Sequence, residues 1–364
     1  MKKLTRKVVR FKGWTLGLDV HKKFIQYSVF DQEGNEIENA RINSERAALL
    51  ALLERLCKRG LLQAALEACG CFLWIFEVLV EKLGRAQVHV AQPSRLAVIA
   101  NSMEKNDAND AWWLAYVLYE GRLPEAFVAE GAQADLRIAE REWHACTRAR
   151  TSALVRIKAH LAQLGLKVPA RWYLSKCGRK TMSELLKTIK DERGKALRML
   201  LKTVAFLSKQ RMYWKAELKE LAAKLPAVKV ISENMPGMAE VISATVYGEL
   251  GDPQRFYNQK AYSKGTGLTP GYRKSAGRES KVGITRQGSA LARWALTSAA
   301  ICCMKCKRGP GLAVRRWIEH QSQYKLKKKV IVAAARKLAE GIWRLFALGE
   351  VFDLEKAFPV KAVA

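Results

Sequence analysis

The sequence lacks any apolar run of about 18 residues or more, the length that a membrane-spanning helix needs. Its most apolar stretch, LLQAALEACGCFLWIFEVLVEKLG, is interrupted by Glu67 and Glu77. The opening residues, MKKLTRKVVRFKGW, are basic and have no apolar core followed by a small-residue cleavage site, so they do not resemble a secretory signal. These absences argue against a membrane protein. We expect a cytoplasmic protein with a basic N-terminal arm.

Regular cysteine spacing is also missing. The eight cysteines form no disulfide framework, and CCMKC holds one C-x-x-C, from Cys303 to Cys306, without a second pair or a neighbouring His. We expect free thiols, with Cys302, Cys303 and Cys306 in an apolar helix and not around a metal ion. No second Gly-rich phosphate loop follows a predicted strand, which argues against an ATPase interpretation of GLDVHKK. No zinc finger or homeodomain motif is present.

Acidic residues are few compared with basic ones. Lys and Arg number 64 against 34 Asp and Glu, which gives a formal net charge of +30. A surplus of this size indicates a polyanionic partner, most simply a nucleic acid, with an affinity that falls steeply as salt rises.

The first third of the chain reads as an α/β domain, expected over residues 1–128. Residues 14–42 predict three strands, and Asn43 or Ser44 is expected to cap a helix that runs to about Gly60. A fourth strand then ends at Glu67, and a helix, a fifth strand and another helix follow. The order βββαβαβα predicts an antiparallel meander followed by strands joined through helical crossovers.

The pattern changes beyond residue 128. Residues 129–227 carry apolar side chains at spacings of three and four with Arg and Lys between them, which predicts an antiparallel helical hairpin or coiled coil, broken near Pro169 and Gly178. Residues 228–364 predict a mainly α domain. There, the Pro236–Gly237 turn before an apolar helix is typical of a helix-hairpin-helix element, residues 256–289 are expected to form a surface loop region, and two or three helices end the chain.

Four carboxylates occupy positions that could form one site. Asp19 ends the first predicted strand and Glu67 ends the fourth, and the carboxyl ends of strands line the usual site of an open α/β sheet. Asp107 and Asp110 lie three apart at the start of a predicted helix, so both project from one face. This pair either stabilises the helix N-terminus or binds a hard cation. If all four converge, two Mg²⁺ ions could flank an in-line phosphoryl displacement.

At this point the motifs resemble a known family. TLGLDVHKK, AALEACG and KNDANDAWWLAYVL resemble, in order and spacing, the resolvase-like N-terminal domain of the DEDD-type insertion-sequence transposases (the IS110 type). MPGMAEVISATVYGELGDPQRF, GTGLTPGYRKSAG, GITRQGSALARWAL and KKKVIVAAARKLA resemble their C-terminal transposase domain. The resemblance covers nearly the whole chain and implies an RNase H-like (RuvC-like) N-terminal domain, with Mg²⁺, or alternatively Mn²⁺, as cofactor. By this resemblance the catalytic and metal-binding D-E-D-D tetrad is Asp19, Glu67, Asp107 and Asp110.

The second half implies a nucleophile. The family uses a serine in the loop after GLTP, which forms a covalent link to DNA, and the matching residue here is Ser275, with Ser280 as second choice. No His lies in this loop, so activation by a metal held in the tetrad is expected. The residues expected to bind nucleic acid are Lys105, Arg273, Lys274, Arg278 and Arg286.

Partners follow from the same resemblance. It implies binding to donor and target DNA, guidance by a structured (bridge-type) RNA, and a homo-oligomer, either a dimer or a tetramer. The large positive charge agrees with these partners, and the helical middle segment could be either a dimerising arm or a plain scaffold.

Two other functions remain open. A hydrolytic, resolvase-like nuclease would keep the fold without the serine, and would retain cleavage in Ser275→Ala. A non-catalytic nucleic-acid-binding scaffold would use the acids as structural caps, and its binding would be indifferent to Mg²⁺ and to Asp107→Ala.

Overall fold

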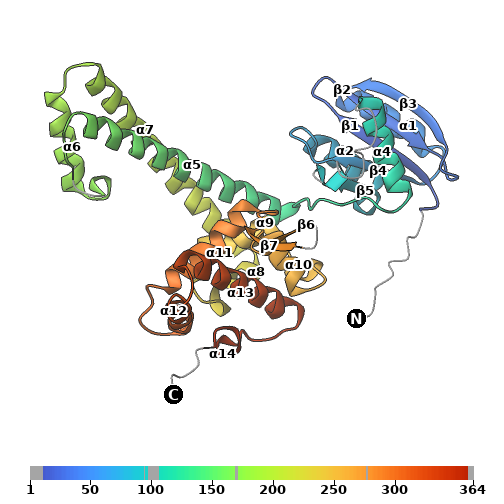
Figure 1. The fold of residues 1–364 in the computed structure, drawn as a ribbon. Helices are drawn as coiled ribbons and strands as arrows, with labels where there is room; N and C mark the ends of the chain where they lie inside the picture. Colours follow the sequence, from blue (N-terminus) through green and yellow to red (C-terminus); the bar gives the residue numbers. More distant parts are fainter. Residues whose placement is uncertain (1–10, 94, 97–105, 169–170, 276–277, 360–364) are drawn as a thin grey trace. The chain divides into compact units, whose positions relative to one another are not determined.

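The computed structural model describes residues 11–93, 95–96, 106–168, 171–275 and 278–359, and of residues 272–275 and 278–282 it describes the backbone only (Figure 1). These residues form two compact units, which divide between Val128 and Ala129. Within the described residues, no helix combines the length and the apolar composition needed to cross a bilayer.

Unit 1 is a five-stranded mixed sheet with helices on both faces. Its strands are β1 (Trp14–Val20), β2 (Phe24–Phe30), β3 (Glu36–Asn43), β4 (Leu62–Glu67) and β5 (Val88–Ala91). Its helices are α1 (Arg46–Cys57), α2 (Leu73–Leu83), the short 3₁₀ helix η1 (Arg85–Gln87) and α4 (Asp107–Tyr119). The strand order is β3-β2-β1-β4-β5, with β3, β2 and β1 antiparallel and β1, β4 and β5 parallel. The predicted meander and crossovers are therefore confirmed.

The two faces of β1 pack against different helices because side chains alternate along a strand. Leu16 and Leu18 join the apolar core formed with α1 and α2. Gly17 faces the other way, toward α4: a Cβ atom at this position would lie 2.2 Å from the carbonyl oxygen of Ala111 and 2.4 Å from the nitrogen of Ala115. Only a glycine permits so close an approach of helix and strand.

The predicted cap of the first helix is wrong. Asn43 is still paired with Phe24 in the sheet, and the Ser44 amide donates to the carbonyl oxygen of Lys23 at 3.1 Å. Both candidates are therefore held by β-structure, and α1 begins after Glu45, whose side chain makes no capping hydrogen bond.

Unit 2 is almost entirely helical. Its first part contains α5 (Gly131–Gln163), η2 (Trp172–Leu174), α6 (Lys176–Thr188), α7 (Glu192–Ala223), α8 (Pro226–Asn234), α9 (Glu240–Leu250) and η3 (Pro253–Arg255). It continues with α10 (Gln259–Gly265), β6 (Pro270–Ser275), β7 (Arg278–Ile284), α11 (Ala290–Cys303), α12 (Pro310–Gln321), α13 (Lys327–Ala347) and α14 (Leu354–Ala357).

The long helices α5 and α7 form the predicted antiparallel hairpin, with α6 at its tip (Figure 1). Arg150 Nε donates to Ser208 Oγ at 2.9 Å, and Arg211 Nε donates to Thr147 Oγ1 at 3.0 Å. From Thr147 to Arg150 the number on α5 rises, while that of the partner on α7 falls from Arg211 to Ser208, so the two helices run antiparallel.

The tip of the hairpin differs in part from the prediction. The chain leaves the helix between Gln163, the last residue of α5, and Lys176, the first of α6, which agrees with the predicted break, although Gly178 lies inside α6 and Pro169 lies outside the described residues. A second break, which was not predicted, falls between α6 and α7. Asp191 caps α7 by accepting the Gly194 amide at 3.1 Å, and a Cβ atom at Gly194 would lie 2.0 Å from the carbonyl oxygen of Ile189. The sharp reversal thus depends on a capping Asp followed by a close-packed Gly.

The C-terminal half of unit 2 surrounds one apolar core, supplied mainly by α9, α11 and α13. The predicted Pro236–Gly237 turn is present: Gly237 has a φ of 74°, and its position leaves no room for a side chain beside the carbonyl oxygen of Ala299. The predicted loop region over residues 256–289 is wrong, because it contains α10 and the two-stranded hairpin of β6 and β7.

Candidate functional site

Two of the predicted acids come together through strand pairing. The parallel pairing of β1 with β4 aligns Leu18 with Leu66, so Asp19 and Glu67, one residue further along, lie side by side at the carboxyl ends of the strands. Aligned residues of parallel strands point to the same face, and this face is the one that α4 covers at Gly17.

The other two acids lie in the first turn of α4. The Asn106 side chain caps this helix by accepting the Asn109 amide at 2.8 Å, and the Asp110 amide donates to the Asn106 carbonyl oxygen at 3.0 Å. Asn39 Nδ2 on β3 donates to the carbonyl oxygen of Ala108 at 3.2 Å. The helix start that carries Asp107 and Asp110 is therefore fixed over the sheet.

A histidine joins these carboxylates. His21 Nε2 lies 2.8 Å from Asp19 Oδ2 and 3.5 Å from Asp107 Oδ1. Arg41 on β3 completes the group, with its guanidinium 3.2 Å from Asp107 Oδ2 and stacked over the Phe24 ring. The sequence interpretation missed His21. Its spacing of two from Asp19 was a usable signal, because alternate residues of an extended chain share a face.

The donor set fits a divalent cation. Donor atoms of Asp19, His21 and Asp107 all lie within 4.8 Å of one another, the one such grouping among the described residues. The Asp19 side chain is 14% exposed and the Asp107 side chain 39%, so the group is open on one side. Carboxylate oxygens suit Mg²⁺ and Mn²⁺, and an open side leaves positions for substrate oxygens.

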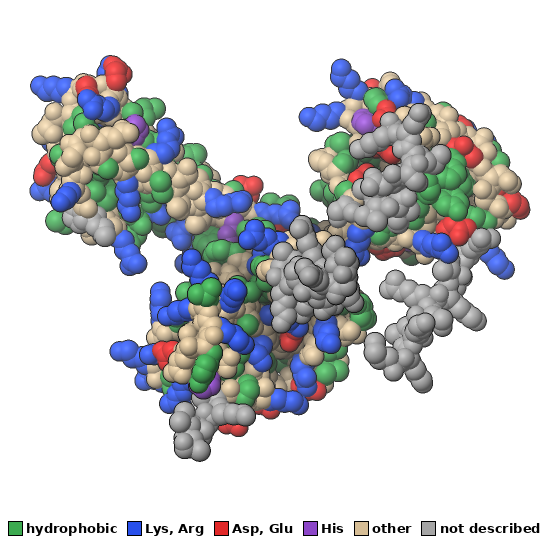
Figure 2. Space-filling view, viewed as in Figure 1, with side chains coloured by type: hydrophobic (Ala, Val, Ile, Leu, Met, Phe, Trp, Pro, Cys, Tyr) green, Lys and Arg blue, Asp and Glu red, His purple; other side chains and the backbone are tan. Residues whose placement is uncertain are grey.

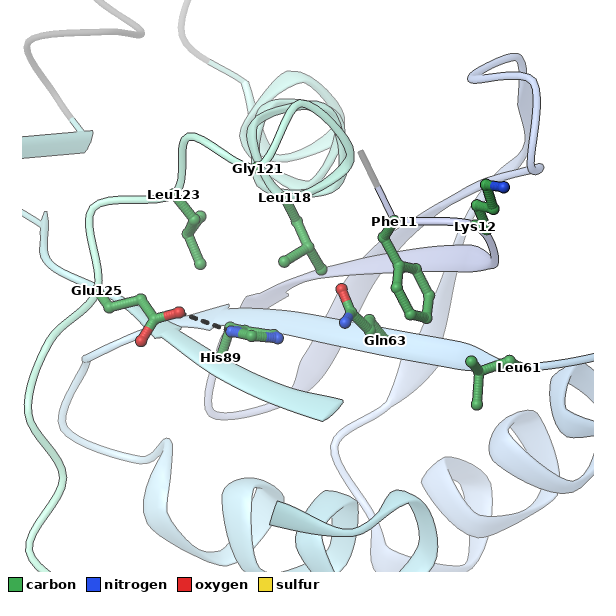
Figure 3. Close-up of a pocket in the computed structure, with 9 residues that line it drawn as sticks. All are labelled: Phe11, Lys12, Leu61, Gln63, His89, Leu118, Gly121, Leu123 and Glu125. Atoms are coloured by element: carbon green, nitrogen blue, oxygen red, sulfur yellow. Dashed lines mark hydrogen bonds and ion pairs between the residues drawn. The ribbon is translucent and has the colours of Figure 1, made fainter. Parts of the chain in front are cut away.

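A cavity of unit 1 lies elsewhere, at the opposite ends of the strands (Figure 3). It holds about 580 Å³ and is lined in part by Phe11, Gln63 and His89. His89 Nδ1 lies 2.7 Å from Glu125 Oε1, and this hydrogen bond lowers the pKa of the Glu125 carboxyl. Gln63 stands near the start of β4 and Glu67 at its end, so the cavity is separate from the carboxylates.

The candidate nucleophile lies in unit 2, on the β6–β7 hairpin. Ser275 is the last residue of β6 and is paired with Arg278, while Arg273 is paired with the alternative, Ser280. Lys274 and Arg278 belong to the same strands, so the hairpin groups four of the predicted site residues with Ser280. Lys105 lies outside the described residues.

Arg286 follows the hairpin. It is exposed and adopts a φ of 55°, unusual for a residue other than glycine. Its amide donates to the carbonyl oxygen of Gly267 at 3.2 Å, which fastens the turn that leads from β7 into α11.

A polar junction with a buried centre joins α5, α9 and α11. Its buried residues are Glu140, His144 and Glu249, and Arg137, Arg141 and Ser289 surround them. Glu249 accepts hydrogen bonds from Arg141 Nε at 2.7 Å and from Ser289 Oγ at 2.7 Å. Glu140 is fully buried beside the Glu249 carboxylate, and neither of its carboxyl oxygens accepts a hydrogen bond from a donor within the described residues. No sequence pattern pointed to this junction, because charged residues on a charged helix normally face solvent.

Burial sets the protonation of this junction. Burial, and after it the neighbouring Glu249 carboxylate, raises the pKa of Glu140 to about 10. Burial also opposes ionisation of Glu249, but hydrogen bonds from Arg141, Glu140 and Ser289 outweigh it and lower that pKa to about 2. Burial, with Arg148 nearby, lowers the pKa of His144 to about 4. At neutral pH the two carboxyl groups therefore share one proton.

Comparisons with known proteins show which family this chain resembles along its length. A family model of the IS110 DEDD group, described as Transposase, matches residues 16–165, and one described as Transposase IS116/IS110/IS902 family matches residues 231–313. The transposase for insertion sequence element IS1111A of Coxiella burnetii is 24% identical over 352 residues, 93% of this chain and 90% of that protein.

Two further relatives match over shorter segments. The putative transposase y4pF/y4sB of Sinorhizobium fredii is 29% identical over 119 residues, 32% of this chain and 31% of its own length. The transposase for insertion sequence element IS1328 of Yersinia enterocolitica is 24% identical over 119 residues, 33% of this chain and 36% of its own. Two transposase models in this order, with a relative aligned along nearly the whole chain, place the protein in the family of IS110-type DEDD transposases.

Proposed function

We propose that this transposase cleaves and exchanges DNA strands by metal-dependent phosphoryl transfer, with a DEDD tetrad in unit 1 and a serine in unit 2. The single observation that carries the proposal is the approach of Asp19 and Asp107 within one group of donor atoms, although they are far apart in sequence. The alignment of Glu67 beside Asp19 and the position of Asp110 in the same first turn as Asp107 support the full tetrad.

An RNase H-like, RuvC-like fold for unit 1 belongs to the same proposal. Its support is the strand order β3-β2-β1-β4-β5, with an antiparallel meander followed by two parallel strands. We also propose that unit 2 divides functionally into a helical arm, residues 129–227, and a transposase domain, residues 228–364, which carries the serine.

The proposed chemistry assigns separate tasks to the two units. Mg²⁺ or Mn²⁺ at the tetrad would lower the pKa of a bound hydroxyl and stabilise charge on the phosphate. The Ser275 hydroxyl gives up its proton as its oxygen forms an ester with the DNA phosphorus, and the DNA oxygen that leaves as one phosphate–oxygen bond breaks takes up a proton. The phosphodiester is therefore exchanged and not hydrolysed. Ser275 lies in the half of the chain that the second family model matches.

The nucleic-acid partners in this proposal are donor DNA, target DNA and a structured guide RNA. The net charge of +30 supports a polyanionic partner. Figure 2 shows Lys and Arg side chains scattered over the visible surface of the α5–α7 hairpin and of the C-terminal helices, with few Asp and Glu among them. The proposed phosphate contacts are Lys105, Arg273, Lys274, Arg278 and Arg286. We also propose a dimer or tetramer, in which the tetrad of one subunit acts together with the serine of another.

The test is a trapping assay. Purified full-length protein, labelled target DNA, RNA transcribed from the flanking DNA and Mg²⁺ are incubated and run on a denaturing gel. We expect a labelled protein–DNA adduct that is lost in Ser275→Ala and in Asp107→Asn and is retained in Ser280→Ala. Adduct lost only in Ser280→Ala would move the nucleophile to that residue.

The main alternative, a hydrolytic nuclease, gives a different result in the same assay. It predicts cleaved DNA without adduct, with Ser275→Ala fully active and Asp107→Asn inactive. DNA binding that neither Mg²⁺ nor Asp107→Asn alters, without cleavage under any condition, would favour a non-catalytic scaffold.

A further inference from the structure

His21 lies in the short connection between β1 and β2, just beyond the carboxyl end of β1 that carries Asp19. Its amide donates to the Phe24 carbonyl oxygen at 3.0 Å, which closes the connection, and its ring stacks on the Phe24 ring with centroids 4.5 Å apart. Backbone and ring are therefore both held, so the direction of Nε2 toward the carboxylates is set by packing.

The distances around Nε2 match those of ligands that share one ion. An octahedral ion with oxygen ligands at 2.0–2.1 Å places neighbouring ligand atoms about 3 Å apart. His21 Nε2 lies 2.8 Å from one Asp19 oxygen and 3.5 Å from one Asp107 oxygen. An ion shared by the three donors would change these two distances by about half an ångström at most.

The charges around the group also favour an ion. Two carboxylates face His21, and Arg41 approaches Asp107 from the β3 side, where it also donates to Gln26 Oε1 at 3.2 Å. The His21 side chain is 39% exposed, so ligand positions stay open on the solvent side for phosphate oxygens. A neutral imidazole can donate a lone pair to an ion at the same place where it now meets the two carboxylates.

We propose that His21 is a nitrogen ligand of the catalytic metal ion, beside Asp19 and Asp107, and that it makes the site prefer Mn²⁺ over Mg²⁺. This inference rests on the proposed metal-dependent function and adds a ligand that the D-E-D-D pattern does not contain. Imidazole nitrogen binds Mn²⁺ and later first-row metals more readily than Mg²⁺, which favours oxygen ligands.

The test observes the bound ion directly. Full-length protein is loaded with Mn²⁺, and electron spin-echo spectroscopy records coupling of the Mn²⁺ electrons to a directly bound ¹⁴N nucleus. His21→Phe keeps the ring stack on Phe24 but removes the lone pair. We expect the nitrogen coupling to disappear in His21→Phe and in a second variant, His21→Gln, with Mn²⁺ affinity reduced at least about tenfold and Mg²⁺ affinity reduced less.

His89→Gln is the matched control, because His89 is another histidine of unit 1 that meets a carboxylate, Glu125, at 2.7 Å. Its nitrogen coupling and Mn²⁺ affinity should equal those of the unmodified chain. Circular dichroism of every variant establishes that the fold is intact.

The outcomes separate this inference from the proposed function. Mn²⁺ that binds without nitrogen coupling and is lost in Asp19→Asn would overturn the ligand role of His21 and leave the carboxylate site standing. Nitrogen coupling that persists in His21→Phe would also overturn it. Mn²⁺ binding that Asp19→Asn and Asp107→Asn leave unchanged would overturn both proposals.

Discussion

The buried Glu140–Glu249 pair predicts an unusual dependence of stability on pH. Glu140 has a raised pKa of about 10 in the folded chain, against an ordinary value of 4.5. Between these values the folded chain holds one proton at Glu140 that the unfolded chain has released. The free energy of unfolding therefore falls as pH rises, by about 1.4 kcal/mol per pH unit.

The other titrating groups of the junction do not obscure this slope at alkaline pH. Glu249 has a lowered pKa, so its contribution is present above its unfolded value and is lost only as pH falls toward about 2. His144 has a lowered pKa of about 4 against 6.5, so its contribution changes only in acid. From pH 7 to pH 9, Glu140 alone should remove about 3 kcal/mol of stability.

Glu140→Gln is the informative change. The amide can donate a hydrogen bond to Glu249, as the protonated carboxyl does, but it has no proton to release. The melting temperature of the variant, relative to that of the unmodified chain, should rise between pH 7 and pH 9 by about 5–11 °C for a unit of this size. Differential scanning calorimetry at the two pH values measures it.

Glu142→Gln is the matched control, because Glu142 is an exposed carboxylate of the same helix. Its melting temperature should follow that of the unmodified chain at both pH values. A difference between Glu140→Gln and the unmodified chain that does not change with pH would refute the reasoning, since it would mean that Glu140 is ionised in the folded protein.

Three further predictions concern the tetrad and the charge. Gly17→Ala forces a methyl group against the backbone of Ala111 and Ala115, and should destabilise unit 1 by about 1–3 kcal/mol and weaken Mn²⁺ binding. Gly70→Ala places its methyl group in open space and should change neither stability nor Mn²⁺ binding. Calorimetry measures the stability and metal titration the binding. Asn106→Ala removes the cap of α4 and should destabilise unit 1 by about 1 kcal/mol in thermal melts. Duplex affinity, measured by fluorescence anisotropy, should fall about a thousandfold between 50 and 200 mM salt if six phosphates are neutralised, and a flat profile would contradict a charge-driven interface.

The sheet of unit 1 could be predicted because its signals are local. Apolar residues in strand patterns predict the strands, and a helix between two consecutive strands predicts that they run parallel. The alignment of Asp19 with Glu67 then follows from the parallel pairing of β1 with β4. The position of the helix carrying Asp107 depends instead on Gly17, which lets α4 pack close to β1. A single glycine in a strand gives no periodic pattern, so this contact could not be predicted from the sequence.

Unit 2 was harder to predict where polar residues form ordered structure. The β6–β7 hairpin is rich in Gly, Lys, Arg and Ser, a composition that favours loops, and two strands form there through pairing with each other. The break before α7 had a usable signal in Asp191 followed by Gly194, but the apolar periodicity on both sides concealed it. The burial of Glu140 had no signal in the sequence, because its neighbour Glu249 lies on another helix, far along the chain.

The position of the buried junction explains why a costly arrangement can persist. Burying two carboxyl groups is unfavourable unless each is hydrogen-bonded. Here Glu249 holds Ser289, the residue that caps α11 and whose amide donates to the Gly265 carbonyl oxygen at 2.9 Å. Gly288, beside it, lies too close to that same oxygen for any side chain. The chain that leaves the β6–β7 hairpin is thus anchored to α9 and α10 directly after its last strand. The β6–β7 hairpin, in which Ser275 is the last residue of β6, needs a fixed attachment to the helices. The hydrogen bonds of Glu249 provide this attachment with a defined direction, which apolar packing alone does not.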